Sequence, residues 1–317
     1  MPDYIISDRD KLNRLIKEAG LSRSELARAL EVSYKAVYRW LDRGVKPHPA
    51  VSRDIDALFK EHVDITEWVE KIRKDIPDPI KLLKKDPLIR AKFFLSLTYN
   101  SNAIEGSRMT LKETEMAIEG KKVRGKELHE VLEAVNHNNA LLYMLEVIRP
   151  GFKITEEYIL RLHSIVMYNF SLKLPGKYRT GYVNLTNTEK ILPSAQMVPI
   201  KMRFLIKNIN RYGKEKIKKI SRDHYEFEGI HPFFDGNGRV GRILMNTQLL
   251  SQGYPPGIIG IEDQFKYYRA LTKGDLGDLA NLTQMVCDSV IKGYNLLFED
   301  SAESKSGRPA PGARPAA

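Results

Sequence analysis

The chain has 317 residues, of which 42% are hydrophobic, enough for one large domain or two of ordinary size. Its 51 Lys and Arg outnumber its 40 Asp and Glu, and the formal charge of +11 favours polyanionic partners without choosing among them. A single cysteine, Cys287, excludes an intrachain disulfide, and no run of about 20 apolar residues could span a membrane. Since the N-terminus also lacks the apolar run of a signal peptide, we expect a soluble, cytoplasmic protein.

The first 62 residues have the pattern of a small helical domain. Apolar residues recur at helical spacing in four segments, 8–20, 22–32, 33–44 and 48–62. Gly20 is a good terminator for the first helix, and Ser22 and Ser33 are suitable N-caps for the next two. We therefore expect a helical domain over residues 1–62, followed by a charged, proline-containing connector over residues 63–85.

Residues 86–299 are expected to form a larger, mainly helical domain. Asp86 and Pro87 suit the start of a helix that runs to about Ile104, and Thr110 with Glu113 forms a capping box for the next one. Between residues 172 and 199, glycine, proline and short β-branched runs indicate a small β-hairpin. Residues 300–317 lack an apolar pattern, so we expect a disordered tail. The prediction is an all-α fold with one hairpin.

The stretch GIHPFFDGNGRVGRIL, residues 229–244, is poor material for a protein core. His231 precedes proline, which disfavours the α conformation, so the preceding helix should end at or before it. Gly236 and Gly238 can adopt positive φ angles, which would let the backbone direct several N–H groups into one concavity. The helix that follows adds unpaired N–H groups and a partial positive charge. Together these features predict an anion-binding site.

The charged side chains of this stretch agree with a polyphosphate ligand. Arg239 and Arg242 are three residues apart, so both lie on one face of the first helical turn, where they oppose the helix dipole unless an anion is bound. Asp235 would repel phosphates unless a divalent cation such as Mg²⁺ lies between them. His231 can accept a proton from an attacking hydroxyl. The residues favour phosphoryl or nucleotidyl transfer without a Walker A motif; the alternative is a glycine-rich helix start with incidental charges.

The segment HPFFDGNGRVGR resembles the signature of the Fic family, His-x-Phe-x-(Asp or Glu)-Gly-Asn-Gly-Arg-x-x-Arg, at every specified position. The resemblance covers roughly residues 86–297. Fic proteins usually transfer AMP from ATP to a hydroxyl side chain of a target protein. The resemblance therefore implies a protein adenylyltransferase that uses ATP as substrate and Mg²⁺ as cofactor and modifies a target protein or itself.

The resemblance also implies roles for the residues of the loop. His231 would deprotonate the target Ser, Thr or Tyr, Asp235 would hold Mg²⁺ against the α- and β-phosphates, and Phe233 would anchor the loop in the core. The backbone of the loop would cradle the phosphates, Asn237 would orient them, and the arginines would bind the β- and γ-phosphates. Two later tyrosines would border the adenine; the alternative is that one of them only packs in the fold. The predicted nucleotide-binding residues are Gly236, Asn237, Gly238, Arg239, Arg242, Tyr267 and Tyr268.

The segment SNAIEG, from Ser101 to Gly106, resembles the inhibitory motif of Fic proteins, (Ser/Thr)-x-x-x-Glu-(Gly/Asn). By resemblance, Glu105 would form an ion pair with Arg242 and keep that arginine from the γ-phosphate, which makes residues 87–106 an inhibitory helix. From the residues alone, Glu105 is an ordinary exposed carboxylate near a helix end. In some Fic proteins the same glutamate positions water to remove AMP, so the reverse activity is an alternative.

Residues 187–199 occupy the position of the β-hairpin flap of Fic proteins. An exposed strand edge there could pair with the backbone of the target and align its hydroxyl, and a plain surface hairpin is the alternative. The predicted flap residues are Ile191, Leu192, Pro193 and Met197.

Residues 21–44, LSRSELARALEVSYKAVYRWLDRG, resemble a helix-turn-helix of the phage-repressor type. The residues with the spacing of its core are Ala27, Leu30, Val32, Val37 and Trp40. The residues that the second helix would present to a DNA major groove or to phosphates are Tyr34, Lys35, Tyr38, Arg39 and Arg43. A helical protein-interaction module is the alternative. Because single units of this kind usually bind DNA as dimers, we expect a homodimer.

Two readings compete with protein adenylylation. The chain could be a DNA-binding regulator whose Fic domain senses ATP. It could also use the Fic fold with another donor, such as UTP, or transfer phosphate alone.

Overall fold

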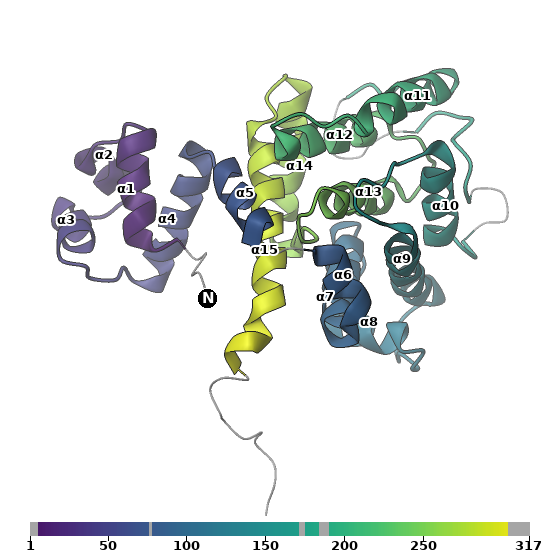
Figure 1. Ribbon diagram of the computed structural model, residues 1–317, viewed down its shortest axis with the longest axis horizontal. Helices are drawn as coiled ribbons and strands as arrows, with labels where there is room; N and C mark the ends of the chain where they lie inside the picture. Colours follow the sequence, from purple (N-terminus) through teal and green to yellow (C-terminus); the bar gives the residue numbers. More distant parts are fainter. Residues whose placement is uncertain (1–5, 76–77, 171–174, 184–189, 304–317) are drawn as a thin grey trace, which may run out of the picture. The chain divides into compact units, whose positions relative to one another are not determined.

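The computed structural model describes residues 6–75, 78–170, 175–183 and 190–303 (Figure 1). The chain divides into two compact units, Met1–Ile72 and Arg73–Ala317. The described residues of both units are helical and contain no β-strand. The prediction of an all-α fold is confirmed.

The first unit contains α1 (Asp8–Glu18), α2 (Arg23–Ala29), α3 (Tyr34–Asp42) and α4 (Pro49–His62), and α5 (Thr66–Asp75) crosses its boundary. The expected N-caps are present: the hydroxyls of Ser22 and Ser33 accept hydrogen bonds from the backbone N–H groups of Glu25 and Ala36. Helix α1 packs against α3 and α4, and α2 packs against α3. Local capping and a shared core therefore produce this unit.

A tight turn joins α2 to α3. Within it Glu31 has a φ of 53°, a left-handed conformation that only a few per cent of non-glycine residues adopt. Arg23 of α2 and Asp42 of α3 form an ion pair at 2.7 Å. Of the residues predicted to form the core, Val32 is half-buried and the others are buried: Ala27, Leu30, Val37 and Trp40.

The second unit begins with α6 (Pro79–Lys85), α7 (Pro87–Ile104), α8 (Leu111–Ile118), α9 (Leu128–Val147) and α10 (Glu156–Val166). It continues with the 3-10 helix η1 (Ala195–Met197), α11 (Val198–Ile209), α12 (Lys216–Ile230) and α13 (Asn237–Ser251). It ends with η2 (Ile261–Asp263), α14 (Gln264–Asp275) and α15 (Ala280–Glu303). Asp86 caps α7 as expected, and Thr110 and Glu113 form the expected capping box of α8.

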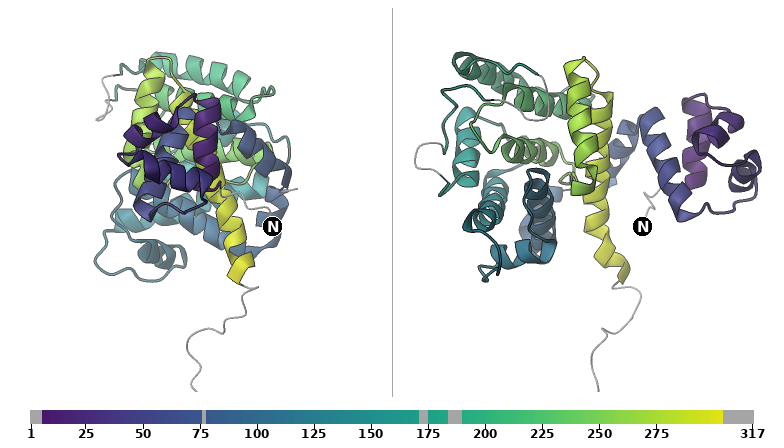
Figure 2. Two further views of the ribbon diagram at one scale, coloured as in Figure 1. Left: turned by 90° about the vertical axis from the view of Figure 1, so that its left-hand side faces the viewer. Right: turned by 180° about the vertical axis from the view of Figure 1, so that it is seen from behind.

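Helix α13 runs through the middle of the second unit (Figures 1 and 2). It packs against α6, α7, α9, α10 and α12, and all its residues from Arg239 to Ser251 are buried. Its polar side chains have partners inside the unit: Thr247 bonds to the hydroxyl of Tyr158 at 2.8 Å, and Gln248 donates to Asp223 at 2.8 Å. A helix enclosed on all sides has no solvent face, so the surrounding helices fix the position of its N-terminus.

The β-hairpin expected between residues 172 and 199 is not found in the described part of that segment. Residues 175–183 and 190–194 have no regular secondary structure, and η1 and the start of α11 follow. The rest of the expected hairpin, residues 172–174 and 184–189, lies outside the described residues. Proline at position 199 suits the first turn of α11, which explains why this end of the segment is helical.

The end of the chain also differs from the expected boundary. Helix α15 extends to Glu303, so residues 300–303 are helical rather than disordered, and residues 304–317 lie outside the described residues. No helix in the described part of the chain is long and apolar enough to cross a membrane.

Candidate active site

The predicted anion-binding loop connects α12 to α13. Helix α12 ends at Ile230, as the following proline predicted, and the His231 N–H still bonds to the Phe227 carbonyl at 3.0 Å. His231 adopts a left-handed conformation, with φ 50° and ψ 62°, rather than the extended one expected before proline. This conformation is a common helix C-terminal cap, and it turns the chain away from α12 within one residue.

Arg179 holds the loop from behind. Its guanidinium is buried and donates to the carbonyls of His231 at 2.8 Å, Gly181 at 3.0 Å and Pro193 at 2.5 Å. Its own N–H bonds to the carbonyl of Pro232 at 2.9 Å. One side chain thus joins the His231 loop to the segment that contains Pro193. No sequence spacing signals this residue, because its partners are backbone carbonyls and all but that of Gly181 belong to other segments.

Phe233 and Asn237 fix the inside of the loop. Phe233 is fully buried, as expected for an anchor, and stacks on the ring of His163 at 3.7 Å. Asn237 accepts from the N–H and donates to the carbonyl of Phe233, both at 2.9 Å. The Asn237 amide, expected to orient phosphates, is therefore committed to the shape of the loop itself.

His163, which no sequence pattern singled out, supports the carboxylate end of the loop. Its Nδ1 accepts from the N–H of Gly176 at 2.9 Å, so its Nε2 carries the proton and donates to the carbonyl of Asp235 at 3.1 Å. Burial lowers the pKa of His163 to about 4, which keeps the ring neutral and this arrangement intact at neutral pH.

The two glycines of the loop serve different purposes. Gly236 has a φ of 78°, and a Cβ there would lie 3.0 Å from the sulfur of Met167. Gly238, which was also expected to use a positive φ, lies instead in the first turn of α13. A Cβ at Gly238 would collide with a carboxylate oxygen of Glu105. The missing side chain at Gly238 therefore leaves the space that the Glu105 carboxylate fills.

Arg242 is a buried cation with partners on α7. Its Nη2 donates to the Glu105 carboxylate at 2.8 Å and to the Ser101 carbonyl at 2.8 Å, and its Nε donates to the Ser101 hydroxyl at 2.9 Å. The Glu105 carboxylate and the nearby Tyr267 and Glu228 hold the pKa of Arg242 above its usual range against the opposing effect of burial. The structure thus brings together the residues that the sequence pattern paired by resemblance.

Arg239 points elsewhere. Its guanidinium donates to Glu133 of α9 at 3.0 Å and to Asp235 at 3.1 Å. Although Arg239 and Arg242 are three residues apart, they reach two different helices, and Arg239 does not line the pocket that Arg242 lines. Glu133 was not predicted, because nothing in the sequence of α9 distinguishes it from other helical glutamates.

A pocket of about 190 Å³ opens beside the N-terminus of α13. At one end it is lined by the predicted catalytic and phosphate-binding residues His231, Gly238 and Arg242, together with Glu105. Helices α12 and α14 form most of the remaining walls, and Lys190 completes the lining. The lining residues that the two helices contribute are Tyr225, Glu228, Gly229, Tyr267, Tyr268, Leu271, Thr272 and Asp275.

The two predicted tyrosines differ in accessibility. Tyr267 is buried, and its hydroxyl bonds to Nε2 of His224 at 2.7 Å. Tyr268 is partly buried, and its hydroxyl donates to the carbonyl of Ile104 at 3.2 Å, directly before Glu105. Both line the pocket, but Tyr268 also holds the end of α7.

The titratable groups of the pocket are shifted by burial. Burial, with Arg179 nearby, lowers the pKa of His231 to about 4, so its imidazole is neutral at pH 7 and able to accept a proton. Burial raises the pKa of Glu228 to about 8, and one of its oxygens has no partner among the described residues. Perturbed groups that gather in a pocket are typical of catalytic sites.

Asp235 is the candidate metal ligand. Its carboxylate is 61% exposed, accepts from the N–H of Gly236 at 2.5 Å and pairs with Arg239. Within the described ranges, no three His, Cys, Asp or Glu side chains gather into a metal-binding group.

The predicted flap residues, all of which are described, do not line the pocket. Leu192 is buried, the Pro193 carbonyl bonds to Arg179, and Ile191 and Met197 are exposed. Lys190, which no sequence pattern indicated, lines the pocket and bonds to Asp275 at 2.5 Å and to the Tyr225 hydroxyl at 2.9 Å. The start of this segment is therefore fixed to α12 and α14.

Residues 153–249, which include the loop and most of α13, match the Fic/DOC family model. The chain is 31% identical over 229 residues to a Nematostella vectensis protein named protein adenylyltransferase Fic, with 68% of this chain and 51% of the relative covered. A Drosophila erecta protein of the same name is 32% identical over 206 residues, with 62% and 40% covered. The chain carries a Fic/DOC family domain. It spans about half the length, or less, of these curated relatives.

Solved structures agree on the fold. Fic-1 (residues 134–508) from C. elegans superposes with a TM-score of 0.65 at 20% identity, over 95% of this chain and 88% of that chain. A Fic domain containing signaling protein from Bacteroides thetaiotaomicron superposes with a TM-score of 0.64 at 23% identity, over 76% and 97%. The fold is that of Fic proteins.

Replacing Arg179 by Met should loosen the loop. The substitution leaves several carbonyls without their donor, at about 1–3 kcal/mol for each buried group, so the unit should lose roughly 3 kcal/mol or more of stability. Amide hydrogen exchange in peptides that span His231 to Gly236 should accelerate. Arg161→Met is the matched control, because Arg161 is exposed on α10 and only lies over the ring of Tyr143. Equal exchange in the two variants would contradict the anchoring role.

The low pKa of His231 can be measured directly. We expect the Hε1 resonance that disappears in His231→Asn to titrate with a midpoint near pH 4, because burial disfavours the imidazolium. Because the folded-state pKa lies below the unfolded value, the ring should stay neutral from neutral pH down to about pH 5. A midpoint at the ordinary histidine value would show that the ring is solvated and not poised as a base.

Proposed function

We propose that this protein transfers AMP from ATP to a Ser, Thr or Tyr hydroxyl of a target protein or of itself. The observation that carries the proposal is one pocket that combines a neutral His231, the backbone at Gly238 and the Arg242 guanidinium at the N-terminus of α13. A helix N-terminus with an added guanidinium favours phosphates, and the curated relatives are named protein adenylyltransferases. Tyr267 and Tyr268 would border the adenine.

In the proposed reaction His231 accepts the proton of the target hydroxyl as its oxygen attacks the α-phosphorus of ATP. The bond between that oxygen and the α-phosphorus forms, the bond from the α-phosphorus to the bridging oxygen breaks, and pyrophosphate leaves. Positioning and electrostatic stabilisation dominate such transfers, so rigid support of the loop by Arg179 and His163 serves the chemistry directly.

Asp235 fits the role of a single protein ligand for Mg²⁺. Mg²⁺ usually takes one or two carboxylates, keeps several waters and completes its shell with substrate phosphates, which suits one exposed carboxylate at the mouth of a positive loop. When bound, Mg²⁺ would neutralise charge on the phosphates. Arg239 and its ion pair with Glu133 would then orient the Asp235 carboxylate.

We further propose that Glu105 inhibits the enzyme. Its carboxylate pairs with Arg242 and lies against Gly238, where the phosphates of a productively bound nucleotide would lie. Ser101 holds the other side of the same guanidinium. A phosphate and the Glu105 carboxylate therefore compete for one cation and one space.

A second candidate function is DNA binding by the first unit. The observation in its favour is that the residues predicted to contact DNA are all exposed, while the residues predicted to form the core beneath them are buried or half-buried. Three of the five exposed residues are cationic: Lys35, Arg39 and Arg43.

The inhibitory role predicts that Glu105→Gly raises self-labelling from α-³²P-ATP and Mg²⁺ by about tenfold or more, the ratio that ~1.4 kcal/mol gives. Glu119→Gly is the matched control, because Glu119 also ends a helix directly before a glycine with positive φ but pairs with Lys121 on the surface. His231→Ala in the Glu105→Gly background should abolish labelling. Equal labelling of Glu105→Gly and wild type would remove the inhibitory role.

The same Glu105→Gly protein identifies the transferred group. Label from α-³²P-ATP but not from γ-³²P-ATP should enter the protein, with an added adenylate in its mass spectrum. Label from γ-³²P-ATP would show phosphate transfer, and a preference for UTP would identify another donor. Loss of label on prolonged incubation of the wild type would reveal removal of AMP.

DNA binding predicts a salt-dependent interaction with a labelled duplex, measured by anisotropy at two salt concentrations. Replacing Lys35 and Arg39 by Ala should weaken binding and reduce the slope of log K against log salt by about 0.9 for each phosphate that is no longer neutralised. Lys122 and Arg124, exposed in the second unit, provide a control pair with the same charge change. Binding that this control pair reduces equally would argue against a helix-turn-helix interface.

A further inference from the structure

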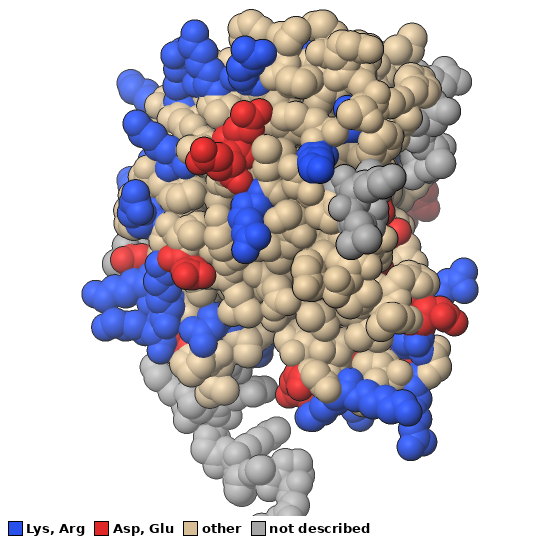
Figure 3. All heavy atoms as spheres, turned by 90° about the vertical axis from the view of Figure 1, so that its right-hand side faces the viewer, with Lys and Arg blue, Asp and Glu red and all other residues tan. Residues whose placement is uncertain are grey.

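The most basic part of the chain directly follows the flap segment. Residues 201–222 contain nine Lys or Arg against one acidic residue, Glu215, a formal charge of +8 in a protein of +11. They cover most of α11, the following loop and the first half of α12. Figure 3 shows Lys and Arg at the upper left, along the left edge and at the lower right of one face of the second unit, with few charged side chains in the middle and right of that face.

The exposed side of α11 combines these cations with apolar side chains, and we call it the α11 face. It consists of two apolar residues, Ile200 and Phe204, and of the three cations Lys201, Arg203 and Lys207, together with Arg211, which lies two residues beyond the end of the helix. Phe204 is 63% exposed and Ile200, one turn earlier, is 39% exposed. The core side of α11 is separate and is formed by Val198, Met202, Leu205 and Ile209, so folding does not require an apolar α11 face.

The cations of the α11 face lack ion-pair partners within the described part of the chain. Lys201, Arg203, Lys207 and Arg211 are exposed and form no ion pair with a described acidic side chain. Arg203 and Lys207 lie one turn apart, an arrangement that destabilises a helix by a few tenths of a kcal/mol. Lys201 interacts electrostatically with Glu226, but Arg203 and Lys207 have no ion-pair partner among the described residues. Exposed aromatic and aliphatic side chains beside these two cations are suited to a partner of opposite charge.

The α11 face directly follows the segment that Arg179 joins to the His231 loop. Met197, exposed in η1, precedes α11 by one residue and lies one turn before Ile200. Four residues earlier, the Pro193 carbonyl bonds to the Arg179 guanidinium, which also bonds to the His231 carbonyl. The segment that leads into the α11 face is therefore fixed to the loop that carries His231.

We propose that the α11 face docks the target protein through an acidic segment that carries apolar side chains. This inference rests on the proposed function, since it names the chemistry of the partner of the same site. Ile200 and Phe204 contact the apolar side chains of the segment, and Arg203 and Lys207 pair with its carboxylates.

A protein segment fits this surface better than a membrane does. Helices that lie on membranes present a wide apolar face to the lipid. The wide apolar face of α11 is buried in the unit, and only a narrow apolar line remains outside.

The test uses two fluorescent peptides with the same tyrosine-containing core. One is extended by alternating Glu and Leu, the other by alternating Lys and Leu. Anisotropy with the full chain should show tighter binding of the acidic peptide, by about tenfold at low salt and less at high salt. Arg203→Glu with Lys207→Glu should reverse this preference, and Phe204→Ala should weaken binding of the acidic peptide. In the Glu105→Gly background, the same order should appear in kcat/KM for adenylation of the peptides.

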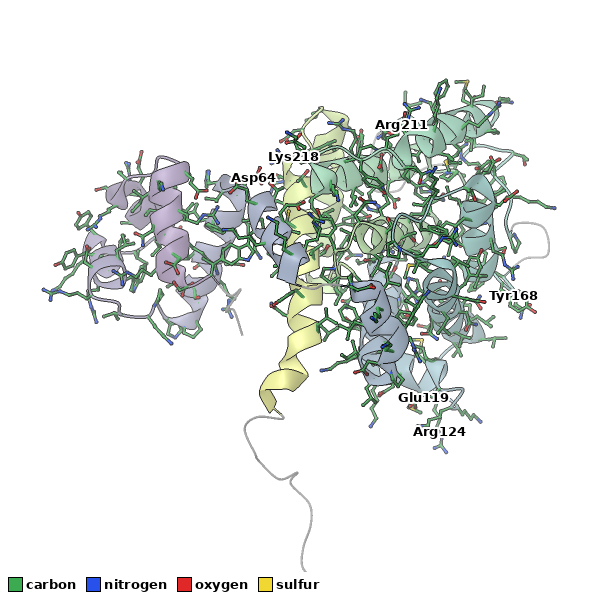
Figure 4. The ribbon with its side chains drawn as sticks, viewed as in Figure 1. Asp64, Glu119, Arg124, Tyr168, Arg211 and Lys218 are labelled. Atoms are coloured by element: carbon green, nitrogen blue, oxygen red, sulfur yellow. The ribbon has the colours of Figure 1, made fainter. Side chains whose placement is uncertain are left out.

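The matched control is Lys122→Glu with Arg124→Glu, which makes the same charge change on exposed residues. Figure 4 labels Arg124 at the end of the second unit opposite to Arg211. Reversal of the preference only in the Arg203 and Lys207 variant supports the proposal. No preference between the peptides, or an equal effect of the control pair, overturns it.

Two further results distinguish docking of a target protein from membrane binding and from a failure of the proposed function. The first uses vesicles of phosphatidylcholine with one third phosphatidylserine. If the vesicles bind the chain more tightly than the acidic peptide does, and the Arg203 and Lys207 variant loses this binding, the docking proposal is overturned in favour of a membrane surface. Self-labelling should be unchanged in that variant, because its residues lie outside the pocket. Absence of self-labelling in every variant would remove the proposed function, while the peptide anisotropy would still decide whether the α11 face binds.

Discussion

The buried guanidinium of Arg242 is the charge on which the site depends. It lies near the start of α13, where the helix dipole adds to its positive potential, so it needs a nearby anion. Glu105 provides that anion in this structure, and Ser101 accepts from Nε and Nη2 of the guanidinium, while Nη1 has no hydrogen-bond partner among the described residues. The same position, between a guanidinium and the backbone at Gly238, suits the phosphates of a nucleotide. In the proposed function, the Arg242 guanidinium would bind either the Glu105 carboxylate or a phosphate of the nucleotide, and only one of these two anions could occupy the position at a time.

The loop that presents His231 is held independently of Glu105. Arg179 fixes its start, Asn237 closes it on Phe233, and His163 fixes its end at Asp235. None of these contacts involves α7. Replacement of Glu105 by a phosphate would therefore leave the catalytic geometry in place, which keeps the reorganisation on nucleotide binding small.

Local rules predicted much of this structure from the sequence. Caps at Ser22, Ser33 and Asp86 were placed correctly because a cap depends only on residues within a few positions. The end of α12 was predicted correctly because Pro232 disfavours the helical conformation at His231. The prediction of a hairpin was wrong for the described part of that segment. Glycine and proline composition does not distinguish a hairpin from an irregular segment that is anchored by a distant side chain. Arg179, His163 and Glu133 were missed for a related reason: each acts through a tertiary contact, and sequence spacing carries no trace of such contacts.

The two arginines of α13 form ion pairs with different carboxylates, and a comparison of the two pairs indicates which carboxylate a nucleotide could displace. Helical spacing placed both on one face, yet Arg239 pairs with Glu133 in the body of α9, while Arg242 pairs with Glu105 at the very end of α7. A carboxylate at a helix C-terminus is disfavoured by the helix dipole, and Glu105 is the more exposed of the two. The carbonyl before Glu105 is held by Gln264 and Tyr268 of α14, and Tyr268 lines the pocket. A nucleotide in the pocket would touch the residue that holds the end of α7, so the pair formed by Glu105 is the one that binding can reach.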